Sequence, residues 1–148
     1  MTLNEVSPTF TLSYSQKLIT RAVDRVIATH RALDRAVARH TPIRRVRVDR
    51  RRSDRLHMQV PVDITPVVER EGVIECVGDT FVGVTRDIAP RGMGFTHDHV
   101  LGSRLILAEF DICRGEPVRL LVERRWHRRN GAFQFCSGGV FTAILLDD

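Results

Sequence analysis

Arginine is the residue with which this chain could do most chemistry. It supplies 22 of the 23 basic side chains among 148 residues, and Lys17 is the only lysine. Its planar guanidinium offers five N–H donors that suit phosphates and flat rings. Residues 1–55 hold 13 basic and 5 acidic side chains, whereas residues 56–148 hold 10 and 13. Although a GC-rich genome can also enrich arginine, this segregation suggests an anionic partner near the first third of the chain.

Two short motifs concentrate the residues that could hold such a partner. Arg51 and Arg55 are spaced RxxxR directly before the first predicted strand. Asp87-x-Ala89-x-x-Gly92 follows about thirty residues later, between two predicted strands. RxxxR alone says little in so arginine-rich a chain, but the pair of motifs at this separation is more specific.

The chain resembles a known family at these motifs. RRSDRLHMQVPVDITPVV, followed by TRDIAPRGMGF, resembles a PilZ domain, whose members bind the bacterial second messenger cyclic di-GMP. The family pattern is RxxxR at the entrance to a six-stranded β-barrel, and then [D/N]xSxxG on the barrel face. LGSRLIL and SGGVF resemble later pieces of the pattern, and Trp126 lies where relatives often carry an aromatic residue. The resemblance covers roughly residues 49–145 and implies a mainly β fold, a six-stranded antiparallel PilZ-like β-barrel.

The resemblance also implies which arginines hold the ligand. Arg51 and Arg55 would wrap cyclic di-GMP, and Arg50 or Arg52 would contribute. Arg91 would be a further phosphate contact or a solvated turn residue. Arginine can pair bidentately with a phosphate or with the Hoogsteen edge of guanine, and it can stack on a purine ring.

The second motif would complete that ligand site. By resemblance, Asp87 accepts hydrogen bonds from guanine N–H groups or fixes an arginine. Gly92 allows the backbone to approach closely or adopts φ > 0 in the turn. Ala89 stands where the family usually has serine, so one hydroxyl contact is lost. One neutral hydrogen bond is worth about 0.5–1.5 kcal/mol, or roughly three- to tenfold in affinity.

The elements before these motifs are a flexible N-terminus at 1–12 and an N-terminal amphipathic α-helix at 13–40. Apolar residues recur at spacings of three and four from Leu18 to Val37. The helix should stop before Thr41-Pro42, because proline disfavours the helical region for the residue before it. Its apolar stripe should pack on the following domain or, less commonly, on a second copy in a homodimer. Residues 41–55 hold seven arginines and should form a solvated arm unless a ligand orders them.

Residues 56–148 are predicted to form the barrel. Alternating apolar residues at 60–64 predict a strand whose prolines suggest an edge or a bulge. Residues 87–94 predict a turn cluster, Asn130-Gly131 predicts a hairpin, and residues 137–139 predict a break between two strands. Trp126 is predicted in the barrel core or rim. Many short strands at regular spacing are typical of a small antiparallel barrel or sandwich.

Other chemistry finds little support in the sequence. No catalytic arrangement is apparent, so we expect no enzymatic activity and no cofactor. His97-Asp98-His99 has no third metal partner in view, which favours a solvated loop. The three cysteines lack CxxC spacing and are expected to be reduced thiols in a cytoplasmic protein: Cys76, Cys113 and Cys136. No apolar run is long enough to predict a membrane span.

We therefore expect a non-enzymatic cyclic di-GMP receptor of bacterial signalling. The ligand would order the arm over the barrel, and the helix would report occupancy to an unidentified protein partner or a second copy. One alternative is a degenerate PilZ module that binds a protein but no nucleotide. A nucleic-acid-binding protein using residues 41–55 is less favoured, because the barrel half is net acidic and lacks interleaved aromatic residues.

Overall fold

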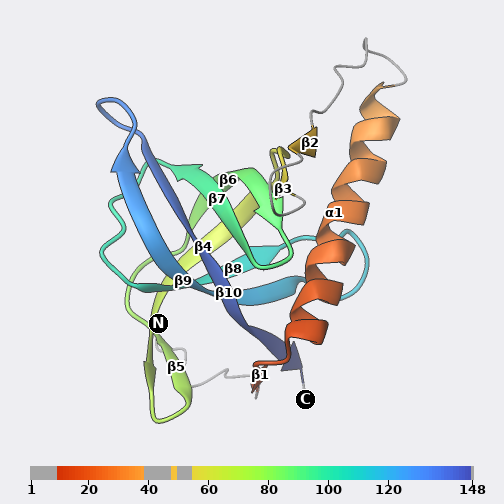
Figure 1. Cartoon of the computed structure of the whole chain (residues 1–148). Coiled ribbons are helices and arrows are strands. Elements are labelled where there is room, and N and C mark those ends of the chain that lie inside the picture. Colours follow the sequence, from red (N-terminus) through yellow and green to blue (C-terminus); the bar gives the residue numbers. More distant parts are fainter. Residues whose placement is uncertain (1–9, 39–47, 50–54, 148) are drawn as a thin grey trace.

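The fold is mainly β, with one helix near the N-terminus, as the sequence predicted (Figure 1). The computed structural model describes residues 10–38, 48–49 and 55–147. The described residues form ten strands rather than six, because four short strands of two to four residues join the longer ones. The elements are β1 (Phe10–Ser13), α1 (Gln16–Ala38), β2 (Val48–Asp49), β3 (Arg55–Leu56), β4 (Pro61–Arg70), β5 (Val73–Cys76), β6 (Phe81–Ala89), β7 (Gly92–His97), β8 (Leu105–Phe110), β9 (Val118–Arg129) and β10 (Phe135–Asp147).

All strands belong to one antiparallel sheet. Its order is β2-β3-β6-β7-β10-β9-β8-β4-β5, and β1 pairs with β10. β4 pairs with β6 as well as with β8. Strand pairing that starts at β6 and passes through β7, β10, β9, β8 and β4 therefore returns to β6. Large side chains such as Phe95, Ile106 and Leu120 are fully buried among these strands.

β4 is not the edge strand that its prolines suggested. It pairs with β6 through Pro61–Ile64, with β5 from Val67 onward, and with β8 along its middle. Pro61 is the first residue of the strand, where a missing N–H is tolerated. Pro66 lies in the gap between the β6 pairing and the β5 pairing, so on that side no partner strand needs its N–H.

The helix begins at Gln16, three residues later than predicted. Ser13 is still part of β1, which pairs with the end of β10, so the expectation of a flexible segment up to residue 12 is wrong for Phe10–Leu12. The Ser15 hydroxyl accepts a hydrogen bond from the Leu18 N–H at 3.3 Å and caps the first turn. The described helix extends to Ala38, and residues 39 and 40 of the predicted helix lie outside the described residues.

The apolar stripe of α1 packs on the protein's own sheet. Ile19, Ala22, Val23 and Val26 are at most 3% exposed and belong to the same cluster as the sheet interior. Full burial of one Val or Ile side chain stabilises a fold by about 1.5–3 kcal/mol. Of the two covers that the sequence allowed for this stripe, the following domain is the one observed. Leu33, further along, is 45% exposed.

β10 runs unbroken through the glycines that were predicted to interrupt it. A Cβ at Gly139 would clash with the backbone carbonyl of Glu123 on β9, so these glycines permit close strand approach instead of ending a strand. The pairing of β10 with β9 has a register shift between Gly138 and Gly139, and the strand continues through it. The predicted hairpin before β10 is confirmed: Gly131 has φ 97°, and the Asn130 N–H donates to the Gln134 carbonyl at 2.7 Å.

Candidate ligand-binding site

The second motif lies on the hairpin between β6 and β7. β6 extends to Ala89 and β7 starts at Gly92, so only Pro90 and Arg91 form the turn. The predicted turn cluster at 87–94 is therefore wrong at both ends. An irregularity between Thr85 and Asp87 shifts the register, after which Asp87 pairs with Gly94.

Asp87 is held across this hairpin by its own side chain. Its Oδ1 accepts a hydrogen bond from the Gly94 N–H at 2.9 Å. The carboxylate is half-buried, and its second oxygen offers further acceptor sites. This geometry fixes the direction of the carboxylate before any ligand arrives.

Ala89 and Gly92 face each other at the end of the hairpin. Ala89 is only 7% exposed, which leaves its methyl group little surface for a ligand. A Cβ at Gly92 would clash with the Gly139 carbonyl of β10. Gly92 does not have positive φ, so of its two predicted roles the left-handed turn is wrong. The close approach occurs, but against the neighbouring strand.

The structure describes only part of the arginine-rich segment around the first motif. Arg50, Arg51 and Arg52 lie outside the described residues. Arg55 begins β3, where the backbone is described and the side chain is not. Val48–Asp49 pairs with Arg55–Leu56 as two short strands, so Val48, Asp49 and Arg55 of the predicted arm are strand. The turn residue Arg91 is exposed, and its carbonyl accepts from the Phe141 N–H at 2.7 Å.

A flat row of residues crosses four strands beside this hairpin, and we call it the outer row. Strand pairing aligns Asp87 of β6, Gly94 of β7, Gly138 of β10 and Trp126 of β9. A Cβ at Gly138 would clash with the Trp126 indole, and one at Gly94 would come within 3.5 Å of it. The indole therefore lies over the two glycines, with Asp87 at the opposite end of the row. Trp126 is 38% exposed, so of the two predicted positions the core is wrong.

Two arginines flank the outer row. The Cζ atom of Arg128 lies 5.4 Å from the centroid of the Trp126 ring. Arg86 donates from Nη1 to the Cys136 Sγ at 3.0 Å, and Cys136 is paired with Arg128 across the strands. The described residues thus combine a carboxylate, an aromatic face and two guanidinium groups on one surface. Sequence reasoning did not single out Arg86, and it predicted no ligand-binding role for Trp126 or Arg128. The available signal was the glycines at 94 and 138, because glycine inside a strand marks a close approach.

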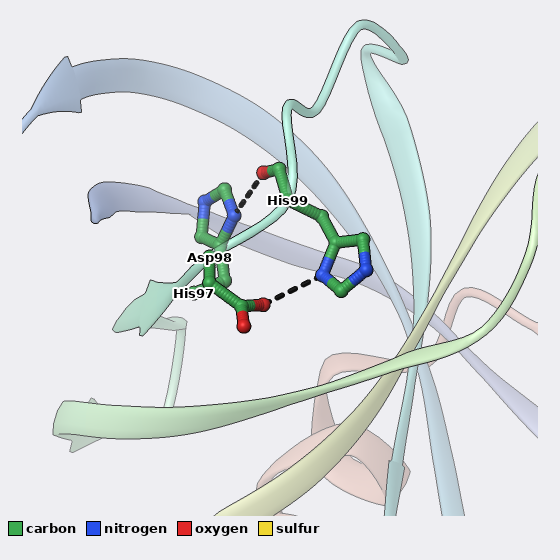
Figure 2. Close-up of polar contacts among 3 residues, drawn as sticks. All are labelled: His97, Asp98 and His99. Carbon is green, nitrogen blue, oxygen red and sulfur yellow. Dashed lines mark hydrogen bonds and ion pairs between the residues drawn. The ribbon is translucent and has the colours of Figure 1, made fainter. Parts of the chain in front are cut away.

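In the motif His97-Asp98-His99 (Figure 2), the first residue is buried and the other two are exposed. His99 is exposed, and its Nδ1 lies 2.6 Å from the Asp98 Oδ1. His97 is 4% exposed and turns inward, so the predicted solvated loop is wrong for this residue. In the part of the chain that the structure describes, no three His, Cys, Asp or Glu side chains gather to hold a metal ion. The three cysteines are free thiols.

No family model matches this chain, and no curated protein matches it either. Within the described ranges, no helix has the length and apolar content needed to cross a membrane.

Proposed function

We propose that this protein is a PilZ-type, non-enzymatic receptor for cyclic di-GMP. The six strands whose pairing returns from β4 to β6 would be the barrel of that family, and the four short strands would be additions to it. This proposal takes the resemblance of the two motifs as its starting point. The arrangement of the described residues supports it in three ways.

The main support is the pairing of β3 with β6. Leu56 pairs with Ile88, so the strand that contains Arg55 runs beside the end of the strand that contains Asp87 and Ala89. In an antiparallel pair with this register, Arg55 comes opposite Ala89. The last arginine of the first motif thus lies in the strand beside the one that carries Asp87 and Ala89, which supports a ligand shared by the two motifs.

The outer row offers the groups that a guanine nucleotide needs. Guanine has N–H groups that can donate hydrogen bonds to the Asp87 carboxylate. Its flat ring can stack on the exposed indole of Trp126. Arg86 and Arg128 are close enough to this row to pair with the phosphates of the same ligand. The arginines of the arm would then close over the ligand, because binding neutralises their mutual repulsion.

A contact also links the hairpin to the helix. The Gln16 Nε2 lies 3.5 Å from the Pro90 carbonyl, in the turn between Ala89 and Gly92. A ligand that shifts this turn would change the contact at the first residue of α1. We propose that α1 in this way reports occupancy to a protein partner or to a second copy. The size of that shift is limited by the ligand's differential affinity for the two states.

Isothermal titration calorimetry of the full chain with cyclic di-GMP tests the proposal. We expect binding at about tens of micromolar or tighter, and a loss of roughly ten- to a hundredfold in Arg55→Ala, because charged hydrogen bonds are lost. Arg114→Ala is the matched control, since it removes the same charge from an exposed turn residue. Cyclic di-AMP should bind much more weakly, because adenine lacks the N1–H that would donate a hydrogen bond to Asp87.

The outcomes separate the proposed function from its alternatives. An absence of heat with cyclic di-GMP would reject the nucleotide receptor and leave the protein-binding module. Equal losses in Arg55→Ala and Arg114→Ala would indicate unspecific charge attraction. Binding of single-stranded RNA that weakens steeply with salt and ignores base identity would favour a nucleic-acid-binding arm.

A further inference from the structure

A serine hydroxyl is buried between two histidines beneath the outer row. Ser137 of β10 is 0% exposed. Its Oγ lies 2.8 Å from the Nε2 of His97 on β7 and 2.7 Å from the Nδ1 of His127 on β9. We call these three residues the histidine clamp, because they join three neighbouring strands through side chains. The function proposed above makes no use of them.

The directions of the hydrogen bonds in the clamp follow from one carbonyl group. The Nδ1 of His97 lies 2.7 Å from the His99 carbonyl oxygen, which can only accept (Figure 2). His97 therefore has its proton on Nδ1 and its lone pair on Nε2. Ser137 must donate to that lone pair, so its oxygen accepts from the Nδ1–H of His127. This is the one arrangement of the neutral clamp in which every bond has one proton.

The surroundings of the clamp oppose positive charge. The rings of Phe81, Phe95 and Phe135 lie 5.1–5.7 Å from the His97 ring, between centroids. Burial lowers the pKa of His97, and burial together with the nearby Arg124 cation lowers the pKa of His127. Asp98 and the His99 carbonyl favour the charged form of His97, whereas His127 and His99 oppose it.

The clamp can accept one proton but not two. A proton on the Nε2 of His127 leaves its Nδ1–H bond to Ser137 intact. A second proton, on the Nε2 of His97, directs two N–H groups at one hydroxyl oxygen and leaves the hydroxyl proton without an acceptor. It also puts two cations in rings whose centroids are 5.8 Å apart. An unsatisfied buried polar group and a like-charge contact both destabilise a fold.

The clamp is built into the same strands as the outer row. Ser137 directly precedes Gly138, His127 directly follows Trp126, and each residue pairs with its counterpart across β10 and β9. We propose that His97, Ser137 and His127 form an acid-sensitive clamp that holds Trp126 over Gly138 and releases it when both histidines are protonated. The surface that carries Trp126 would then be intact at neutral pH and lost on acidification. This inference concerns the fold and holds whichever ligand the outer row binds.

The direction of the pH effect follows from linkage. An unfolded histidine binds its proton near about pH 6.5, whereas the two clamp histidines resist protonation while folded. As the pH falls below that value, the unfolded or opened state binds more protons than the clamped state. The clamped state therefore loses stability as the pH falls through about 6.5 and below.

Intrinsic fluorescence tests the clamp directly, because Trp126 is the only tryptophan. We expect its emission to change between about pH 6.5 and about pH 5 with a slope steeper than that of one proton. This change should precede the loss of far-ultraviolet circular dichroism in the same samples. His97→Gln and His127→Gln each remove one of the two protons, so the transition should move to lower pH by about one unit or more. His57→Gln, which alters an exposed histidine, should behave like the wild type.

Two outcomes would overturn the proposal. One is an unchanged transition in both clamp variants. The other is a wild-type emission that stays constant until the whole protein unfolds. Long-range ¹H–¹⁵N spectra of the wild type add a test that needs no variant: at about pH 7.5, above the free histidine pKa, both clamp histidines should show the Nδ1–H tautomer. An Nε2–H tautomer at His97 would contradict the assigned chain of hydrogen bonds.

Discussion

The two faces of β7, β10 and β9 are packed in different ways by residues that are neighbours in the sequence. On the outer face, Gly94 and Gly138 have no side chain, and the Trp126 indole occupies the space above them. On the inner face, the buried Ser137 and His97 and the partly buried His127 are hydrogen-bonded to one another, and His97 also bonds to the His99 carbonyl. One face thus gains a flat, partly exposed aromatic surface, and the other gains a rigid connection between strands.

This difference teaches how a surface site can be held without being buried. Trp126 is 38% exposed and is not part of the buried core clusters of the described residues. The strand backbones beneath it are fixed from the other side, where the buried polar side chains of the described residues are fully hydrogen-bonded. Changes to the outer face should therefore act on ligand binding, and changes to the inner face should act on stability, except where an added atom strikes Trp126.

The largest effect is expected for Gly138→Ala. The added Cβ would overlap the indole, so either Trp126 or β10 must move. Overpacking of this kind costs about 2–3 kcal/mol of unfolding free energy. Urea unfolding and the emission of Trp126 would both report it. Gly102→Ala is the control, because a Cβ there meets nothing within 4 Å. Equal stability of the two variants would disprove the close contact.

Thr85→Val should come next, and it tests a buried polar side chain on β6, the strand beside β7. Thr85 is 1% exposed. Its hydroxyl accepts a hydrogen bond from the Val60 N–H and donates one to the Met58 carbonyl, in the segment between β3 and β4. Valine would leave both backbone groups unsatisfied, at a cost of about 1–2 kcal/mol. Thr80→Val removes a hydroxyl at the surface and should change the unfolding free energy by less than about 0.5 kcal/mol. A loss as small as the control's would mean that water replaces the Thr85 bonds.

Asp87→Asn separates binding from stability on the outer face. Asparagine keeps an oxygen for the Gly94 N–H, so unfolding by urea should be unchanged. It replaces one acceptor by an N–H₂ donor, so the affinity for cyclic di-GMP should fall about tenfold, or 1.4 kcal/mol. Calorimetry would measure it against Asp79→Asn, an exposed residue between β5 and β6. Unchanged affinity would remove Asp87 from the proposed site.

The smallest effect is expected for Arg128→Gln. Its guanidinium lies over Trp126, and an exposed cation–π contact is worth about 0.5–1 kcal/mol. The Trp126 emission should shift while the urea midpoint barely changes. Arg129→Gln, one residue further along β9, should leave the emission as it is. A shift of the same size in both variants would show that the emission responds to net charge alone.

Much of the fold was predictable because it depends on local pattern. The helix, the apolar stripe of α1 and the hairpin at Asn130-Gly131 follow from periodicity and turn chemistry. The edge assignment of β4 and the break at residues 137–139 were wrong for a common reason. A sequence shows where proline restricts the backbone and where glycine leaves it free. Whether a strand ends at such a residue or continues through it depends on the neighbouring strands.

For the candidate site, the sequence by itself determined the arginine-rich composition, the charge segregation and the two motifs with Arg55 and Asp87. These are properties of residue type and spacing. Only the tertiary structure decided that Trp126 lies over two glycines and that Ser137 lies between two histidines. The reason is physical: these contacts join strands through a register that no single segment specifies, and one residue of slip would turn every such side chain to the other face.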